Sequence, residues 1–165
     1  MRIKSKSMLN IAILVLALAS AILAFYIWYA HIAFEEGITV SADGVTEAVV
    51  EVRDLSLVPA QSKEYTINLI CKATGGYHIS LIYEEKIDGG MKQFVNVTVK
   101  LGDREVYRGS LSGLLNGEEV IQFDGELEEK EPLPVTVIYE MPTSIGNEAQ
   151  GTYADFDVRV EILKS

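Results

Sequence analysis

Cysteine and histidine are scarce in this 165-residue chain, and their scarcity excludes several kinds of site. Cys71 is the only cysteine, so the chain cannot form an internal disulfide or a paired-cysteine metal site. The two histidines, His31 and His78, lie far apart in the sequence. They cannot provide the zinc-hydrolase motif, in which two histidines flank a glutamate at helical spacing. We therefore expect no metal site.

Motifs for other kinds of catalysis are missing as well. The chain has no Gly-x-Ser-x-Gly sequence and no glycine-rich phosphate loop. A Ser-His-Asp arrangement would have to use His78, which we expect on the solvent face of a strand. Pairs of acids can hydrolyse glycosides, but acids that alternate along strands are more typical of a solvated face. We expect no catalytic residues, no cofactor and no enzymatic activity.

Charged residues are absent from positions 8–34, and Arg2, Lys4 and Lys6 stand just before this run. A bilayer core needs about 20 apolar residues in helical form to cross it. The basic flank favours a cytoplasmic N-terminus. We therefore predict one hydrophobic helix that contacts the membrane at least before processing, with the rest of the chain extracellular or at the cell surface.

Residues 1–34 allow two interpretations. A cleaved signal peptide is favoured by the basic start, by the apolar stretch Ile11–Leu18 and by small residues at Ala19–Ala21 and Ala24. A retained transmembrane anchor is favoured by the aromatic residues that follow, which resemble an interfacial belt: Phe25, Tyr26, Trp28 and Tyr29.

The external part, residues 35–165, is strongly acidic. It contains all 24 acidic residues and 11 of the 14 basic ones, for a formal charge of about −13. This balance argues against nucleic acid and anionic lipid as partners, since both require a basic surface. Solubility explains the acidity most simply. Cation binding is the alternative for the acidic stretch 126–131 with Asp124, although no EF-hand-type loop is present.

Apolar and polar residues alternate along most of the external part, which is the pattern of half-buried strands. The clearest cases are residues 77–83, 95–101, 135–141 and 154–162. Further strands are expected near Ile38–Ala42, Ala48–Leu55, Glu64–Lys72, Glu105–Tyr107 and Val120–Phe123, with one short helical turn at Leu111–Leu115. Tight turns are expected at Gly75-Gly76, Asp88-Gly89-Gly90, Gly102-Asp103, Asn116-Gly117 and Asp124-Gly125.

Eight or nine short strands with one apolar face each must pair those faces, which predicts one all-β domain built as a two-sheet sandwich.

Cys71 shares the parity of Ile67 and Leu69 and is expected to be buried. Asn96 begins an Asn-Val-Thr triplet and is expected to face outward, as a possible N-glycosylation site.

Several segments resemble the TasA and camelysin family of small, secreted, fibre-forming proteins. The resemblance runs from about Gly37 to Ile162 and includes the turn Leu57–Ser62. Its most specific part follows Met141-Pro142 and resembles the family's Asn-x-x-Gln-Gly signature, carried here by Gly146, Asn147, Gln150 and Gly151. Independently of the family, asparagine tolerates left-handed turns and glycine permits a tight turn before the last strand.

This resemblance implies a jelly-roll sandwich that is exported and processed by a dedicated signal peptidase. It also implies self-association into filaments, in which the N-terminal segment of one subunit completes the sheet of its neighbour. Cleavage after Ala21 or Ala24 would leave a candidate donor strand rich in aromatic and β-branched residues. Its residues are Phe25, Tyr26, Ile27, Trp28, Tyr29, Ile32 and Phe34.

The chain departs from the family pattern before its first domain strand. Family members usually have a polar, strand-forming segment there, whereas only residues 31–36 separate the aromatic run from Gly37. The leading hypothesis is a structural subunit of an extracellular fibre or biofilm matrix. In this hypothesis the aromatic segment, freed by cleavage, takes the place of the family's polar strand as the donor strand. The alternative is a monomeric, membrane-anchored sandwich that acts as a surface binding module.

Overall fold

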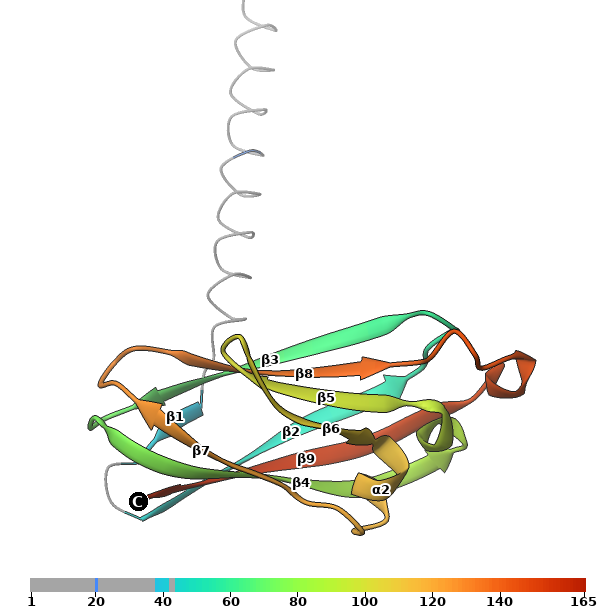
Figure 1. The fold of residues 1–165 in the computed structure, drawn as a ribbon. Helices are drawn as coiled ribbons and strands as arrows, with labels where there is room; N and C mark the ends of the chain where they lie inside the picture. The colour runs from blue at the N-terminus through green and yellow to red at the C-terminus, as the bar shows by residue number, and fades with distance from the viewer. Residues whose placement is uncertain (1–19, 21–37, 42–43) are drawn as a thin grey trace, which may run out of the picture. The chain divides into compact units, whose positions relative to one another are not determined.

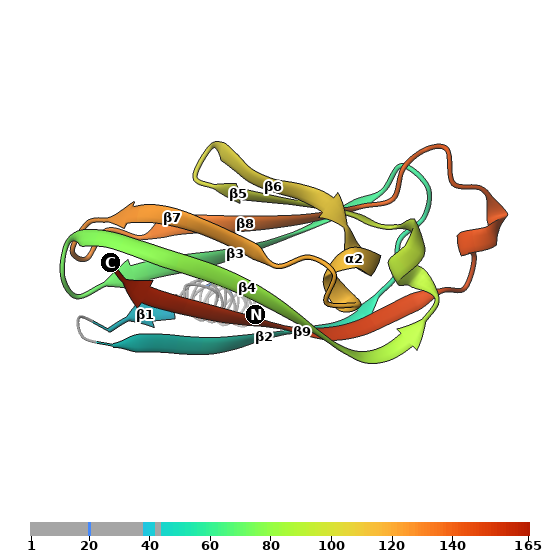
Figure 2. The same ribbon diagram turned by 60° about the horizontal axis from the view of Figure 1, so that its bottom comes forward.

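The computed structural model describes Ser20, residues 38–41 and residues 44–165. The part from residue 38 onward is a sandwich of two β-sheets, seen as two layers in Figures 1 and 2. The all-β, two-sheet prediction is confirmed at this level. Nine strands form it: β1 (Ile38–Val40), β2 (Val45–Leu55), β3 (Ser62–Cys71), β4 (Gly75–Gly89), β5 (Asn96–Leu101), β6 (Arg104–Ser110), β7 (Ile121–Leu127), β8 (Leu133–Glu140) and β9 (Tyr153–Lys164).

The strand order determines which backbone edges remain open. The five-stranded sheet has the order β1-β3-β8-β5-β6, and the four-stranded sheet has the order β2-β9-β4-β7. All neighbours pair antiparallel except β1 and β3, which are parallel. The edge strands are therefore β1 and β6 in one sheet and β2 and β7 in the other.

The core forms because the alternating residues of the long strands all point between the two sheets. In β9 the buried positions are Ala154, Phe156, Val158, Val160 and Ile162, as the alternation predicts. In β4, β5 and β8 the inward positions are buried in the same way, and Cys71 is 1% exposed; the buried residues are Tyr77, Ile79, Leu81, Tyr83, Val97, Val99, Val135, Val137 and Tyr139. All the buried apolar residues that the structure describes lie between positions 40 and 162.

Three predicted glycine turns are confirmed and two are wrong. Gly90, Gly102 and Gly117 have φ values of 84°, 57° and 72°, as tight turns require. Gly75-Gly76 instead begins β4, where it pairs with β7. Gly125 lies inside β7, and a Cβ there would approach Leu101 Cδ2 to 3.2 Å. Close packing between the sheets, not turn geometry, explains this glycine.

Three short helical segments connect the strands. The predicted turn at Leu111–Leu115 is helix α2, whose N-cap Ser110 accepts a hydrogen bond from Gly113 N at 3.0 Å. Leu111 and Leu114 of α2 are buried. The 3₁₀ turns η1 (Met91–Phe94) and η2 (Asn147–Ala149) precede β5 and β9.

The predicted hydrophobic helix of residues 1–34 and the candidate donor strand lie outside the described residues, Ser20 excepted. Among the helices that the structure describes, none is long and apolar enough to span a membrane.

Candidate assembly site

Among the residues that the structure describes, most of β3 lacks a partner strand on one side. Strand β1 has three residues and pairs only with Leu69, Ile70 and Cys71. The preceding part, Ser62–Asn68, pairs with β8 on one side. Within residues 38–41 and 44–165, no strand pairs with its other side. Figure 1 shows β1 as a short arrow beside one end of β3. Seven residues of β3 therefore present an unpaired backbone edge, to which a further strand can add.

The inward side chains of β3 become more exposed beyond the position opposite Ile38, the first residue of β1. Leu69 is fully buried beside β1, Ile67 is 9% exposed, and Tyr65 is half-buried. The Tyr65 ring packs edge-on against Tyr139, with 5.7 Å between ring centroids. Lys63 Nζ lies 5.4 Å from the centroid of the Tyr65 ring. The open edge thus carries an apolar surface that continues into the core.

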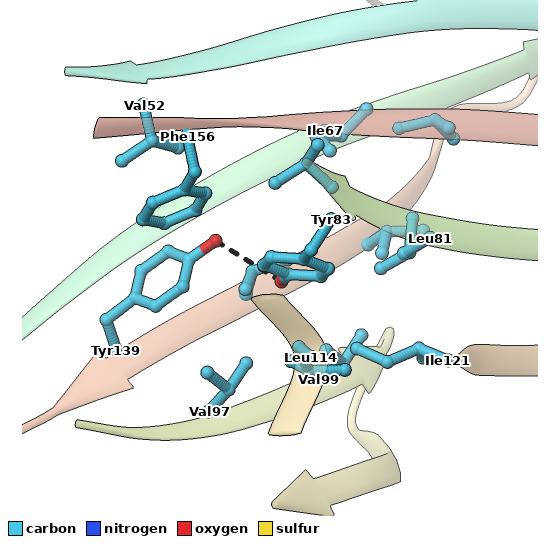
Figure 3. Packing of buried hydrophobic residues seen from close by; sticks show 14 of the residues in the cluster. Val52, Ile67, Leu81, Tyr83, Val97, Val99, Leu114, Ile121, Tyr139 and Phe156 are labelled. Atoms are coloured by element: carbon cyan, nitrogen blue, oxygen red, sulfur yellow. Dashed lines mark hydrogen bonds between the residues drawn. The ribbon is translucent and has the colours of Figure 1, made fainter. Parts of the chain in front are cut away.

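Behind Tyr65, a cluster of aromatic side chains fills the middle of the sandwich (Figure 3). Tyr139 packs against Phe156 at 5.5 Å, and Tyr83 stacks on Phe156 at 5.7 Å. The hydroxyls of Tyr83 and Tyr139 are hydrogen-bonded at 3.2 Å. Burial raises the pKa of both phenols above the ordinary tyrosine range. The pair therefore stays neutral and fixes the position of Tyr139 beneath Tyr65.

A pocket of about 240 Å³ lies near the start of β3. It is lined by Ser56–Pro59 and by residues of the 146–151 segment. The Leu57–Ser62 turn and the Asn-x-x-Gln-Gly segment, which are far apart in the sequence, therefore both line this pocket. Val58 in the wall of this pocket is 63% exposed. We call this cavity the end pocket.

Backbone hydrogen bonds hold the loop that carries the end pocket. Ala60 N donates to the Met141 carbonyl, and Met141 N donates to the Gln61 carbonyl, both at 3.0 Å. Ala60 has a φ of 67°, a left-handed conformation that favours glycine. Pro59-Ala60 therefore forms this turn without a glycine.

The signature residues have different roles from one another. Gly151 has a φ of 76° and makes the predicted tight turn before β9. Asn147 does not have a positive φ; it begins η2, and its carbonyl accepts a hydrogen bond from Gln150 N at 3.0 Å. Gly146 N donates to Glu148 Oε1 at 3.0 Å, which lowers the pKa of Glu148. All four signature residues are exposed, as suits a surface and not a core role.

His78 lies on the outer face of the four-stranded sheet, as predicted. It is exposed, and its Nδ1 is hydrogen-bonded to Asp124 Oδ1 on the neighbouring strand. Among the described residues, no serine hydroxyl is hydrogen-bonded to His78. The structure brings together an imidazole and a carboxylate but not the third group of a hydrolase triad.

Two remaining predicted features can be located on the surface. Asn96 is exposed on β5, opposite Ser110 and Glu140, as its parity predicts. The acidic residues of the 126–131 stretch are exposed at the end of β7 and beyond it. Within the described part of the chain, no three histidine, cysteine, aspartate or glutamate residues are grouped so that they could hold a metal ion.

A hydrogen bond between Tyr107 and Glu119, beside the edge strand β6, was not predicted. Tyr107 on β6 donates its hydroxyl hydrogen bond to Glu119, and partial burial and this carboxylate raise the pKa of Tyr107. A Cβ on Gly109 would overlap the Tyr107 hydroxyl, and Gly113 lies beside Glu119. In the sequence, the only sign of this contact is that two glycines, Gly109 and Gly113, lie near Tyr107. Only the fold shows that these glycines leave space for the tyrosine hydroxyl and the Glu119 carboxylate.

Comparisons with known proteins do not identify a family. No family model matches the chain, and no curated protein matches it. Among solved structures, PliG of Aeromonas hydrophila, a periplasmic inhibitor of g-type lysozyme, has a TM-score of 0.39 and 15% identity, over 76% of this chain and 96% of its own. FlhE has a TM-score of 0.42 and 11% identity, over 74% of this chain and 97% of its own. A chain from infectious bursal disease virus, Gx strain, has a TM-score of 0.30 and 8% identity, over 74% of this chain and 33% of its own.

Proposed function

We propose that this protein is a non-enzymatic structural subunit of an extracellular fibre or cell-surface matrix, and that subunits join by strand addition. The observation that carries the proposal is the open edge of β3. Ser62–Asn68 lack a partner strand on one side among the described residues, next to the half-buried Tyr65. An added strand would satisfy the backbone groups of this edge and cover those side chains.

The accompanying fold assignment is a jelly roll, related to the TasA and camelysin family. It is supported by two sheets in which most neighbouring strands are distant in sequence, such as β3 with β8 and β2 with β9. The meeting of the Leu57–Ser62 turn with the signature residues at the end pocket also supports it.

The proposal requires that the domain lie outside the cell. Export is supported by the uncharged run at 8–34 behind a basic N-terminus. The donor strand is then the aromatic segment left after cleavage, from Phe25 to Phe34. An addition of this kind is a head-to-tail contact, which propagates into an open filament.

The test uses the mature protein purified from cells that export it. The chain beginning near Phe25 should form filaments visible by electron microscopy. A variant lacking residues 25–36 should remain a monomer by light scattering. A matched control replaces the same twelve positions with a glycine-serine segment, which keeps the length but removes the aromatic side chains. Equal assembly by all three chains would exclude the donor-strand mechanism.

A monomeric surface module anchored by an uncleaved helix is the second candidate. The aromatic residues Trp28 and Tyr29 at the outer end of the uncharged run favour it, since such residues mark membrane interfaces. The mass of the mature chain separates the two candidates. An N-terminus at Met1 supports the anchor, and one between Ser20 and His31 supports the fibre.

A further inference from the structure

Strand β2 presents the longest unpaired backbone edge in the described part of the chain. It has 11 residues and pairs with β9 on one side. Within residues 38–41 and 44–165, no strand pairs with its other side, and Figure 2 shows β2 along the border of its sheet. The start of β2 lies beside β1, since Ser41 N donates to Thr46 Oγ1 at 2.7 Å. Residues 47–53 follow this contact.

The edge of β2 has few of the features by which proteins prevent further strands from adding. Residues 45–52 include no lysine, arginine or proline, and their only charged residues are Glu47 and Glu51. Val49 points outward and is 56% exposed. Val50 points inward and packs against the core, but it is only partly buried. A partner strand would pair with the backbone of this edge and cover these apolar side chains.

Pairing two copies of β2 about a two-fold axis limits which residues can meet. The two strands run antiparallel and inward residues meet inward residues, so one residue lies at the centre, opposite its own copy. The regular part of β2 is Val45–Arg53, because Asp54 has a φ of 49° and the pairing with β9 shifts there. Three registers overlap by seven residues or more, and their central residues are Ala48, Val49 and Val50.

Charge distinguishes these three registers. The first, centred on Ala48, places no two charged residues opposite one another. The second, centred on Val49, places Glu47 opposite Glu51 twice, and opposed like charges destabilise a strand pair. The third, centred on Val50, places Glu47 of each copy opposite Arg53 of the other, which makes two pairs of opposite charge. The edge is therefore complementary to itself in the third register.

The third register also continues the apolar core across the contact. On the inward face Val50 lies opposite its own copy, and Ala48 lies opposite Val52, which is 1% exposed. On the outer face Arg53 Nη2 is held by Asp157 Oδ1 at 2.7 Å, while 43% of the arginine side chain remains accessible to a further carboxylate. The inward row contributes apolar burial, and the outer row contributes the register.

We propose that two copies of this protein pair their β2 edges antiparallel about a two-fold axis at Val50, with Glu47 of each copy beside Arg53 of the other. The contact joins two four-stranded sheets into one sheet of eight strands. It uses β2, whereas strand addition in the proposed function uses β3, so this inference does not depend on that function. One strand from each copy makes a small interface, and small interfaces are weak. The protein is therefore monomeric when dilute and dimeric when concentrated.

Cysteine cross-linking tests the register in the protein purified from cells that export it. The buried Cys71 is replaced by serine, and Val50→Cys is introduced at the centre of the contact. The control is Ala48→Cys, the preceding inward residue, which the register separates from its own copy by four residues, or about 13 Å. We expect Val50→Cys to form disulfide-linked dimers about tenfold faster, since only that cysteine comes within reach of its copy. Equal rates, or no dimer from Val50→Cys, would overturn the proposal.

Charge reversal tests the two ion pairs, with sedimentation over a range of protein concentrations as the measurement. Glu47→Arg places arginines opposite one another and should weaken dimerisation about tenfold. The control Glu126→Arg makes the same charge change on β7, the other edge of the same sheet, and should leave dimerisation unchanged. Equal weakening by both variants would mean that the β2 edge is not the contact.

A double variant tests whether the two charges meet. Glu47→Arg combined with Arg53→Glu restores opposite charges across the contact, and it should recover most of the lost dimerisation. Arg53 also holds Asp157, so circular dichroism first establishes that the double variant is folded. A folded double variant that stays as weak as Glu47→Arg would contradict the register.

Deletion of residues 25–36 separates this inference from the proposed function. The deleted chain should form no filaments, yet it should keep the dimers at high concentration and the Val50→Cys cross-link, because β2 is unchanged. Loss of the dimers together with the filaments would overturn the β2 contact. Dimers cross-linked through Val50→Cys in a protein that never forms filaments would support the β2 contact and contradict the proposed function.

Discussion

The two lateral sides of the sandwich, where the sheets have their edge strands, are covered to different extents. On the side of β6 and β7, helix α2 contacts β4 and β6 and inserts Leu111 and Leu114 into the core. Arg104 on β6 donates to the Asp124 carbonyl on β7 at 3.2 Å, and Tyr107 donates to Glu119. On the side of β2 and β3, the described part of the chain provides only the three residues of β1.

Under the proposed function, this difference distinguishes the side that would receive a strand from the side that would not. Proteins protect exposed strand edges with charges, coverings and short strands. Strand β6 carries three charged residues, two of which, Arg108 and Glu105, form an ion pair at 2.7 Å. The open stretch of β3 carries two charged residues at its start, Lys63 and Glu64, and is uncharged from Tyr65 to Asn68. The closed side stabilises the monomer, and the open side is suited to receive a strand.

The largest effect is expected from a matched pair of truncations, one on each side. Leu114→Ala should lower the free energy of unfolding by roughly 2–5 kcal/mol, because it leaves a cavity under α2. Ile67→Ala, in a chain that begins at Gly37, should cost at least about 1 kcal/mol less, because this side chain borders the uncovered edge. Urea unfolding measures both. Equal losses would mean that the two sides are equally closed.

An intermediate effect is expected in the core that the two sides share. Tyr83→Phe removes the hydrogen bond to Tyr139 and leaves a buried hydroxyl without it, at a cost of about 1–3 kcal/mol. The double variant Tyr83→Phe with Tyr139→Phe removes both hydroxyls and should be closer to the original stability than the single variant. A double variant that loses the sum of the two single losses would exclude coupling between them.

The smallest effect is expected at the end of the open side. Ala60→Gly should relieve the left-handed backbone of the loop beside the end pocket and raise the free energy of unfolding by up to about 1 kcal/mol. Thermal unfolding measures the change. The control Ala73→Gly alters an alanine without a positive φ and should not stabilise the domain. Stabilisation by both variants would indicate an effect unrelated to the left-handed turn.

The strands were predictable because their signal is local. The alternation in residues 77–83 and 154–162 requires one apolar face, and both segments bury that face in the structure. Glycine was ambiguous, because the same residue permits a left-handed turn at Gly102 and close packing between sheets at Gly125. Only the positions of Leu101 and Ile79 around Gly125 distinguish the second case.

The candidate site was only partly predictable. Periodicity identifies β3 as a strand but does not say which strands flank it. Pairing between Ile38 and Leu69 joins residues distant in sequence, and no local pattern determines how far that pairing extends. The signature residues and the Leu57–Ser62 turn were visible separately, and their meeting at one pocket depends on the order of the strands.

The sequence by itself determined an all-β domain, its buried faces, the acidic surface and an uncharged N-terminal run, because composition and period-2 alternation are properties of neighbouring residues. The tertiary structure alone decided that, among the described residues, β1 pairs with β3 at three positions and no strand lies on that side of β3 beside Tyr65. Edges are set by contacts between distant segments, which each strand can make only after the others have assembled around it.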